Sequence, residues 1–139
     1  MSDMARTRDY LNVRLEPREA EAVSNLGLAH IGDCVYELMV RSRLVCGGTL
    51  TNRSLHAATV EYVSARAQAK AAGALLSHLT EEERAVYKRG RNTRVNSVPK
   101  RAQIGDYHAA TGLECLFGWL YLLGRHERLN ELFSYIVEA

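Results

Sequence analysis

The sequence predicts an all-α protein, and three observations support this class. Apolar residues recur at three- and four-residue steps in the longer segments, as at Leu28, Ile31 and Val35. Proline occurs only twice, whereas Ala, Leu, Glu and Arg recur throughout, and no alternating strand pattern is present. A chain of 139 residues with 47% hydrophobic and 24% charged residues can form a single domain with its own hydrophobic core.

The first third of the chain predicts an arm followed by two helices. Residues 1–15 are expected to form an N-terminal arm, extended or partly ordered, and residues 16–139 the folded domain. Pro17, with acids behind it, suits the first turn of a short helix. A long helix is expected over about 26–45, and the glycines after Cys46 end it.

Capping residues mark the helices in the middle of the chain. Thr51 is expected to cap a helix over about 52–61. The alanine-rich segment 64–79 predicts a helix that either continues its predecessor or bends near Tyr62. Thr80 with glutamate three residues later is a capping box, which opens a short helix ending around 88–90.

A loop is expected over 91–105, because it contains Pro99 and little apolar periodicity. Asp106 can then cap a helix over 107–123, whose apolar and aromatic content predicts burial on most sides. Gly124 breaks the chain before a final amphipathic helix over 127–137.

The composition favours a cytosolic protein. No apolar signal region follows the polar N-terminus, and no segment approaches the roughly 20 apolar residues that span a membrane. The three cysteines are odd in number and widely spaced, so we expect reduced core residues rather than disulfides or a zinc site. These are Cys34, Cys46 and Cys115.

Two lone acids carry the functional information. Asp33 and Glu114 each lie in an apolar helical segment close to glycine. A buried carboxylate is normally hydrogen-bonded, paired with a base or bound to a cation. Taken singly, either acid is more often a structural partner than a metal ligand. Together they suggest a Mg²⁺ site, provided that their helices pack side by side.

Glu37 lies one helical turn after Asp33 and leaves two readings open: it can face the same site, or it can pair with Arg41 at i+4.

A basic segment separates the two acids. Residues 84–105 contain seven basic residues and no acid, while the net charge of the chain is only +2. This local block indicates contact with phosphates, with a solvated surface loop as the alternative.

Three motifs resemble one enzyme family. The stretch from Leu28 through Glu37 resembles the signature helix of the ribonuclease III catalytic domain, and the stretch from Thr111 through Leu122 resembles its second acidic motif. Between them, residues 88–92 and the later Pro99-Lys100 resemble the small Mini-ribonuclease III branch, which has no double-stranded-RNA-binding domain. The resemblance covers about residues 24–137.

The resemblance implies a helical homodimer that cuts both strands of double-stranded RNA with Mg²⁺, leaving 5′-phosphate and 3′-hydroxyl ends. Asp33 and Glu114 would be the catalytic acids and metal ligands. The associated role is maturation of large-subunit ribosomal RNA precursor in bacteria, and a ribosomal protein is an open further partner.

The chain departs from full-length ribonuclease III at two positions. Where those enzymes carry further acids, this chain has Ala29 and Thr111. The small branch resembles this chain in that respect, although fewer carboxylates would hold Mg²⁺ more weakly. The alternative function is a noncatalytic RNA-binding or ribosome-assembly module that kept the fold. A helix-turn-helix DNA binder is disfavoured, because the basic residues lie largely in a loop.

Duplex RNA is recognised through its phosphates and 2′-hydroxyls, which suits basic residues on a dimer surface. The candidate RNA-binding residues are Lys88, Arg89, Arg91, Asn92, Arg94, Lys100 and Arg101, with Arg66, Gln68 and Lys70 as a weaker group. The candidate dimer interface, carried by the resemblance more than by pattern, is Ile31, Cys34, Val35 and Leu38.

Overall fold

The structure is a computed structural model that describes residues 9–48, 51–93 and 103–139. Within these residues all regular structure is helical, which confirms the all-α class, and none of the helices is long and apolar enough to cross a membrane. The helices are α1 (Pro17–Glu21), α2 (Asn25–Cys46), α3 (Asn52–Val63), α4 (Ala65–Leu75), the 3-10 turn η2 (Leu76–His78), α5 (Glu81–Arg91), α6 (Ile104–Leu122) and α7 (His126–Val137).

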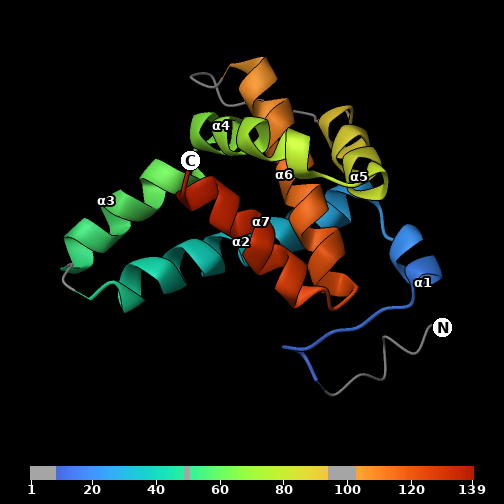
Figure 1. Ribbon diagram of the computed structural model, residues 1–139, viewed down its shortest axis with the longest axis horizontal. Helices are drawn as coiled ribbons and strands as arrows, with labels where there is room; N and C mark the ends of the chain where they lie inside the picture. Colours follow the sequence, from blue (N-terminus) through green and yellow to red (C-terminus); the bar gives the residue numbers. More distant parts are fainter. Residues whose placement is uncertain (1–8, 49–50, 94–102) are drawn as a thin grey trace.

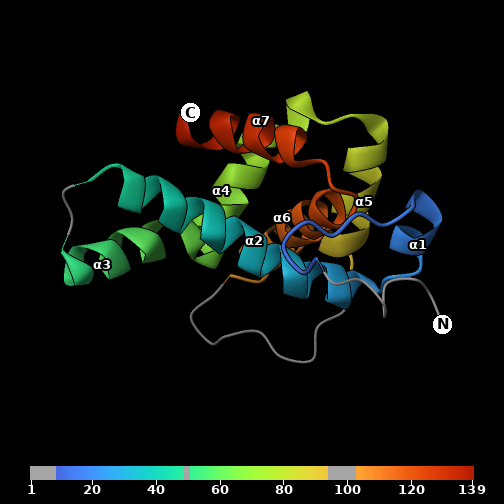
Figure 2. The ribbon, with the colours of Figure 1, turned by 90° about the horizontal axis from the view of Figure 1, so that it is seen from below.

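Helix α6 is the centre of the fold. Figures 1 and 2 show it passing through the middle of the molecule, with α2, α4, α5 and α7 packed around it. Its side chains are apolar on nearly every side, as expected for a helix buried all round. Leu113, Leu116, Phe117 and Leu120 are fully buried. The predicted burial of this segment is confirmed.

Two glycines let α2 and α6 cross with their backbones in contact. A Cβ atom at Gly32 would overlap the carbonyl of Glu114, and one at Gly118 would overlap the carbonyl of Leu28. Any side chain at either position would therefore push the two helices apart. This close approach brings the two acidic motifs together.

A second glycine contact joins α5 to α6. A Cβ at Gly90 would lie 2.6 Å from Cys115 Sγ, and one at Gly112 would lie 2.7 Å from the Tyr87 ring. The last turn of α5 thus packs directly on the part of α6 that carries Glu114.

The junction between α3 and α4 settles an alternative left open by the sequence. Ser64 has extended backbone angles and its side chain accepts a hydrogen bond from the Ala67 amide, so it caps a new helix. The chain therefore breaks between α3 and α4 rather than continuing. The predicted caps at Thr51 and Thr80 are both confirmed.

Two predicted boundaries around the basic segment are wrong by one to three residues. Helix α5 continues through Arg91, and α6 begins at Ile104 with Gln103 at the cap. Asp106 therefore lies in the first helical turn instead of at the cap. An acid is favourable in either place, because the helix N-terminus carries partial positive charge.

A buried ion pair fixes α5 against α7. Arg128 donates two hydrogen bonds to the Glu83 carboxylate, each at 2.8 Å, and Glu83 is only 3% exposed. Burial raises the pKa of Glu83, but hydrogen bonds from Arg128 and Thr80 outweigh it and lower the pKa below its usual value. The carboxylate stays ionised and paired.

The described end of the N-terminal arm lies against the C-terminal half of α6. The Leu15 amide donates to the Leu122 carbonyl at 2.7 Å, and Leu15 is buried. The Tyr121 hydroxyl contacts the carbonyls of Tyr10 and Leu11 at 3.2 and 3.0 Å. The arm from residue 9 onward is thus held to the domain, as Figure 2 shows.

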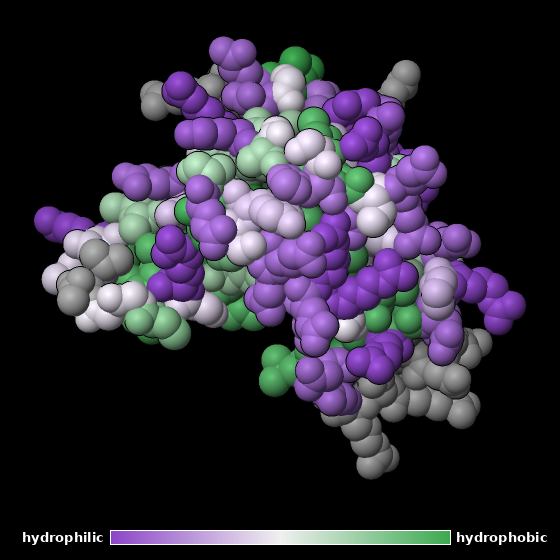
Figure 3. Space-filling model, in the orientation of Figure 1, coloured by the Kyte–Doolittle hydropathy of each residue, from purple (hydrophilic) through white to green (hydrophobic). Residues whose placement is uncertain are grey.

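The face of the molecule in Figure 3 is mainly hydrophilic, and hydrophobic side chains reach the surface there over the α2–α3 region at the left. Val45 and Val60 of these helices are more than 45% exposed. The prediction that the cysteines lie in the core is wrong for Cys34 and Cys46, which are exposed. Cys34 does not share the buried face of α2 that Val35 and Tyr36 occupy, and Cys46 is the last residue of that helix, whereas Cys115 is buried.

Candidate active site

The two acidic motifs meet at the α2–α6 crossing. Gly32 contacts the backbone of Glu114, so Asp33, the next residue on α2, lies beside the Glu114 side chain. Asp33 is exposed and Glu114 is half-buried. The expectation that both acids are buried is wrong for Asp33, because Gly32, Val35 and Tyr36 occupy the inner face of α2.

The two carboxyl groups repel one another when both are ionised. Burial raises the pKa of Glu114 to about 8, with further contributions from the Asp33 charge and from a hydrogen bond between the two side chains. Near neutral pH the pair therefore retains a proton that a cation could replace.

The neighbouring positions add no third free carboxylate. Glu37 Oε2 lies 2.8 Å from Arg41 Nη2, so the structure favours the pairing alternative. Thr111 is buried and its hydroxyl donates to the Tyr107 carbonyl at 3.0 Å. Within the described residues no group of three or more His, Cys, Asp or Glu side chains could hold a metal ion.

The basic end of α5 lies next to this crossing. Lys88, Arg89 and Arg91 are exposed on its last turn, and Asn92 is the C-cap. The Arg91 guanidinium lies 5.9 Å from the centroid of the Tyr87 ring, which orders it in part. We call residues 88–92 the basic turn.

Other predicted RNA-binding residues divide into two groups. Arg94, Lys100 and Arg101 lie outside the described residues. On α4, Arg66 and Lys70 are exposed, but Gln68 is buried at 3% and donates to the Val63 carbonyl at 3.0 Å. Gln68 therefore cannot reach a nucleic acid, since it fills the α3–α4 junction.

The predicted dimer residues do not share one exposed face. Cys34 and Leu38 are exposed and Ile31 is half-buried, but Val35 is 8% exposed and belongs to the core of its own chain. The free face of α2 thus comprises Cys34 and Leu38, with Ile31 at its edge.

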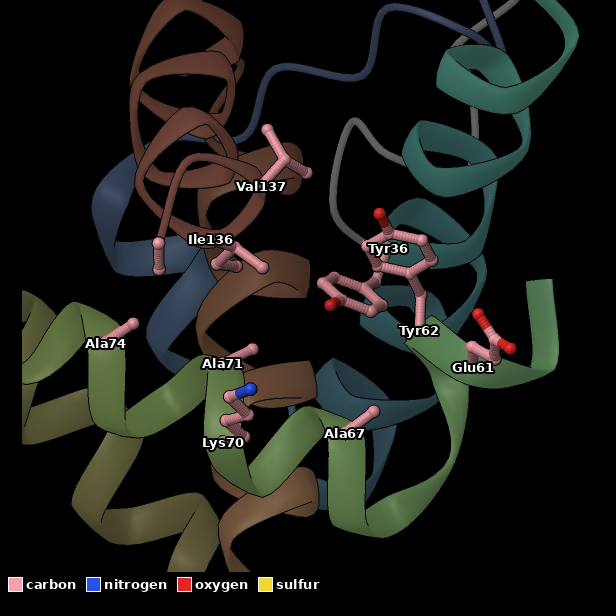
Figure 4. Close-up of a pocket in the computed structure, with 10 residues that line it drawn as sticks. Tyr36, Glu61, Tyr62, Ala67, Lys70, Ala71, Ala74, Ile136 and Val137 are labelled. Carbon is pink, nitrogen blue, oxygen red and sulfur yellow. The ribbon is translucent and has the colours of Figure 1, made fainter. Parts of the chain in front are cut away.

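A cavity of about 250 Å³ lies between α2, α3, α4 and α7, as Figure 4 shows. Tyr36 and Tyr62 form one wall, and Lys70 and Ile136 lie opposite. Burial and the neighbouring Tyr62 raise the pKa of Tyr36 to about 12, so its phenol is neutral. Neither Asp33 nor Glu114 lines this cavity, and its groups offer no activated nucleophile.

Sequence reasoning missed the residues that join the basic turn to the acids. Gly90 packs on Cys115, and Cys115 Sγ donates to the Asn25 carbonyl at 3.1 Å. A glycine inside a basic helical end was the available signal, because glycine is unfavourable in a helix unless packing requires it.

Comparisons with known proteins show the family to which the chain belongs. The Ribonuclease III domain model matches residues 26–125. The chain is 41% identical over 123 residues to Mini-ribonuclease 3 of Enterococcus faecalis, covering 87% of this chain and 93% of that protein. It is 45% identical over 107 residues to Mini-ribonuclease 3 of Symbiobacterium thermophilum, covering 77% and 82% respectively.

A solved structure has the same fold. Protein FN1578 from Fusobacterium nucleatum superposes with a TM-score of 0.78 at 26% identity, covering 85% of this chain and 96% of that one. The matched segment of the domain model spans both acids and the basic turn. The chain therefore belongs to the Mini-ribonuclease 3 family, within the ribonuclease III domain family.

Proposed function

We propose that this chain is a Mg²⁺-dependent endoribonuclease that cuts double-stranded RNA as a homodimer in the bacterial cytoplasm. Membership of the Mini-ribonuclease 3 family makes it an endoribonuclease. The duplex specificity, the metal, the dimer and the compartment are our proposal. The carboxylate pair at the α2–α6 crossing is the observation that carries it.

The pair fits a hard divalent cation. Mg²⁺ is commonly bound by one or two protein carboxylates, with waters and substrate phosphates completing its coordination. Asp33 and Glu114 supply two carboxylates, one open to solvent and one half-buried. Burial, and to a smaller extent the Asp33 charge, raises the pKa of Glu114, and a positive charge between the two carboxyl groups would favour their ionised forms.

The side chains of the site would have the following roles in RNA cleavage. Asp33, which is exposed, and Glu114, which is half-buried at the helix crossing, are the two residues that would hold the cation. A bound Mg²⁺ supplies Lewis acidity, which activates water for attack at phosphorus and offsets charge on the leaving oxygen. The expected products carry 5′-phosphate and 3′-hydroxyl ends.

The basic turn would hold the duplex. Lys88, Arg89 and Arg91 project from the helix that packs behind Glu114, so phosphates held there lie close to the carboxylates. Such contacts read shape rather than sequence. We also propose Arg94, Lys100 and Arg101 as RNA contacts, and Arg66 with Lys70 as a weaker second group.

A homodimer would use the free face of α2. Leu38 is 60% exposed there, beside the exposed Cys34. An exposed apolar side chain next to the candidate active site favours association with a second copy of the chain. Leu38→Lys should convert a dimer into a monomer in sedimentation velocity, whereas Val45→Lys on the same helix should not. A wild-type monomer at micromolar concentration would refute the proposed dimer.

The natural substrate we propose is large-subunit ribosomal RNA precursor, because that is the role the family resemblance implies. A ribosomal protein is a further partner that the same role leaves open. Incubation of the enzyme with precursor transcripts, alone and with added large-subunit ribosomal proteins, would show whether the ends of the mature RNA are produced.

The proposed activity is tested on a defined RNA duplex. Wild type should cut both strands with Mg²⁺ and not with chelator. Asp33→Asn should abolish cutting while binding persists, and Glu127→Gln, an exposed charge change on α7, should cut normally. Duplex binding without cuts under any divalent metal would point instead to a noncatalytic module.

A further inference from the structure

A hydrogen-bond chain ties the end of α5 to the start of α2. Asn25 Nδ2 donates to Thr93 Oγ1 at 3.1 Å, and Thr93 Oγ1 donates to the Arg89 carbonyl at 2.8 Å. Asn25 and Thr93 are both half-buried and lie 68 positions apart. A hydroxyl has one proton and two lone pairs, so Thr93 can accept from one partner while donating to the other.

Thr93 also completes the end of α5. The last carbonyls of a helix lack intrahelical partners. Here the Asn92 amide donates to the Lys88 carbonyl at 3.0 Å, the Thr93 amide to the Gly90 carbonyl at 3.2 Å, and the Thr93 hydroxyl to Arg89. The backbone of the basic turn is therefore held in place by the two residues that follow the helix.

Asn25 also connects the C-terminal end of α5 to the carboxylate site. Its backbone carbonyl accepts from Cys115 Sγ at 3.1 Å, and Cys115 is fully buried and directly follows Glu114. Gly90 of the basic turn packs on the same sulfur. Asn25 thus contacts α6 with its backbone and, through Thr93, the basic turn with its side chain.

We propose that Asn25 and Thr93 are positioning residues that fix the basic turn relative to the Asp33–Glu114 pair. Neither touches the duplex in this proposal; both act through Lys88, Arg89 and Arg91. Long basic side chains can hold a phosphate in position only if their own backbone is held in position. Loosening the basic turn should therefore weaken RNA binding without slowing the chemical step. The inference rests on the proposed function, and deepens it.

The test uses five variants of the full chain. Thr93→Val keeps the shape and removes the hydroxyl, and Thr93→Ser restores the hydroxyl. Thr59→Val is the control, because the Thr59 hydroxyl makes the same kind of bond to its own helix, donating to the Leu55 carbonyl at 2.7 Å on α3, away from the site. Asn25→Ala and the double variant Asn25→Ala/Thr93→Val complete a mutant cycle.

Each protein is measured in three ways on one RNA duplex: kcat and KM with Mg²⁺, the Kd in chelator, and the dependence of Kd on salt. Thr93→Val should raise KM and Kd about fivefold to tenfold with kcat within about twofold of wild type. Its plot of log Kd against log salt should be shallower by about one unit, because a phosphate contact is lost.

Further outcomes decide the inference. Thr93→Ser should restore KM and the salt dependence, and the double variant should be no worse than the poorer single one, since both remove the same bond. A fall in kcat at unchanged KM, an unchanged salt dependence, or an equal defect in Thr59→Val would overturn the positioning role.

The failure of this inference is distinguishable from failure of the proposed function. If wild type binds duplex RNA but never cuts it, the Kd and its salt dependence still test Asn25 and Thr93. If wild type cuts and all variants match it, the positioning role is refuted while the activity stands. If wild type neither binds nor cuts duplex RNA, both are refuted.

Discussion

Replacing Glu114 by glutamine should stabilise the metal-free protein at high pH while abolishing its activity. Burial, together with the facing Asp33, raises the pKa of Glu114 from 4.5 to about 8. The native state therefore keeps a proton between these pH values that the unfolded chain has released. By linkage, the protonated Glu114 contributes its full stabilisation below pH 4.5. This contribution is lost as the pH rises from 4.5 through 8.

The size of this fall follows from the shift. Each pKa unit corresponds to about 1.4 kcal/mol, so full ionisation of Glu114 costs the metal-free fold at most about 5 kcal/mol. Asp33 is exposed, so solvent screens its share of the repulsion, and about 2 to 4 kcal/mol is expected. Glutamine carries no charge, so Glu114→Gln should not lose this part of its unfolding free energy over the same pH range.

The measurement is urea unfolding of wild type and Glu114→Gln at pH 5, 7 and 9, in chelator and in Mg²⁺. In chelator the two proteins should be about equally stable at pH 5, and the variant more stable at pH 9. In Mg²⁺ the difference should shrink, because the cation offsets the repulsion only in wild type. Equal unfolding free energies at all three pH values in chelator would refute the electrostatic account.

Three further predictions concern the scaffold. Gly32→Ala should destabilise the fold by about 1 to 3 kcal/mol or more and reduce cleavage, because a Cβ there overlaps the Glu114 carbonyl; thermal unfolding would show it. Arg128→Met should lower the free energy of unfolding by about 3 to 5 kcal/mol at pH 7, because it leaves the buried Glu83 unpaired. This loss should shrink as the pH falls and Glu83 takes up a proton, which urea unfolding at several pH values would detect. Tyr121→Phe should change stability by less than about 1.5 kcal/mol but expose the arm, so trypsin should cleave the arm about twofold to tenfold faster; an unchanged rate would contradict the role of the hydroxyl.

The helices could be predicted from the sequence because their signals are local. Thr51 and Thr80 cap the helices that follow them, and Gly124 adopts a positive φ of 74° where the chain was expected to turn. The boundary errors arose in the basic segment, where no apolar stripe marks the end of α5 or the start of α6.

The candidate site could be predicted only in part. Its two acids were identifiable because each lies alone in an apolar helical segment with glycine nearby. The environments of these two side chains could not be predicted from the sequence, since Asp33 is exposed and Glu114 is half-buried. The proton that the pair retains depends on that difference and on the contact between Asp33 on α2 and Glu114 on α6, which are more than 80 positions apart in sequence.

The sequence by itself determined the all-α class, the caps, the placement of most helices and the identity of the two acids, because these depend on neighbours within one or two turns. The tertiary structure alone decided which faces are covered. It turned Val35 and Gln68 inward, left Cys34 exposed, and joined Asn25 to Thr93. The physical reason is that helical periodicity defines a stripe but not its partner. The partner is set where glycines let backbones touch, as at Gly32 and Gly118.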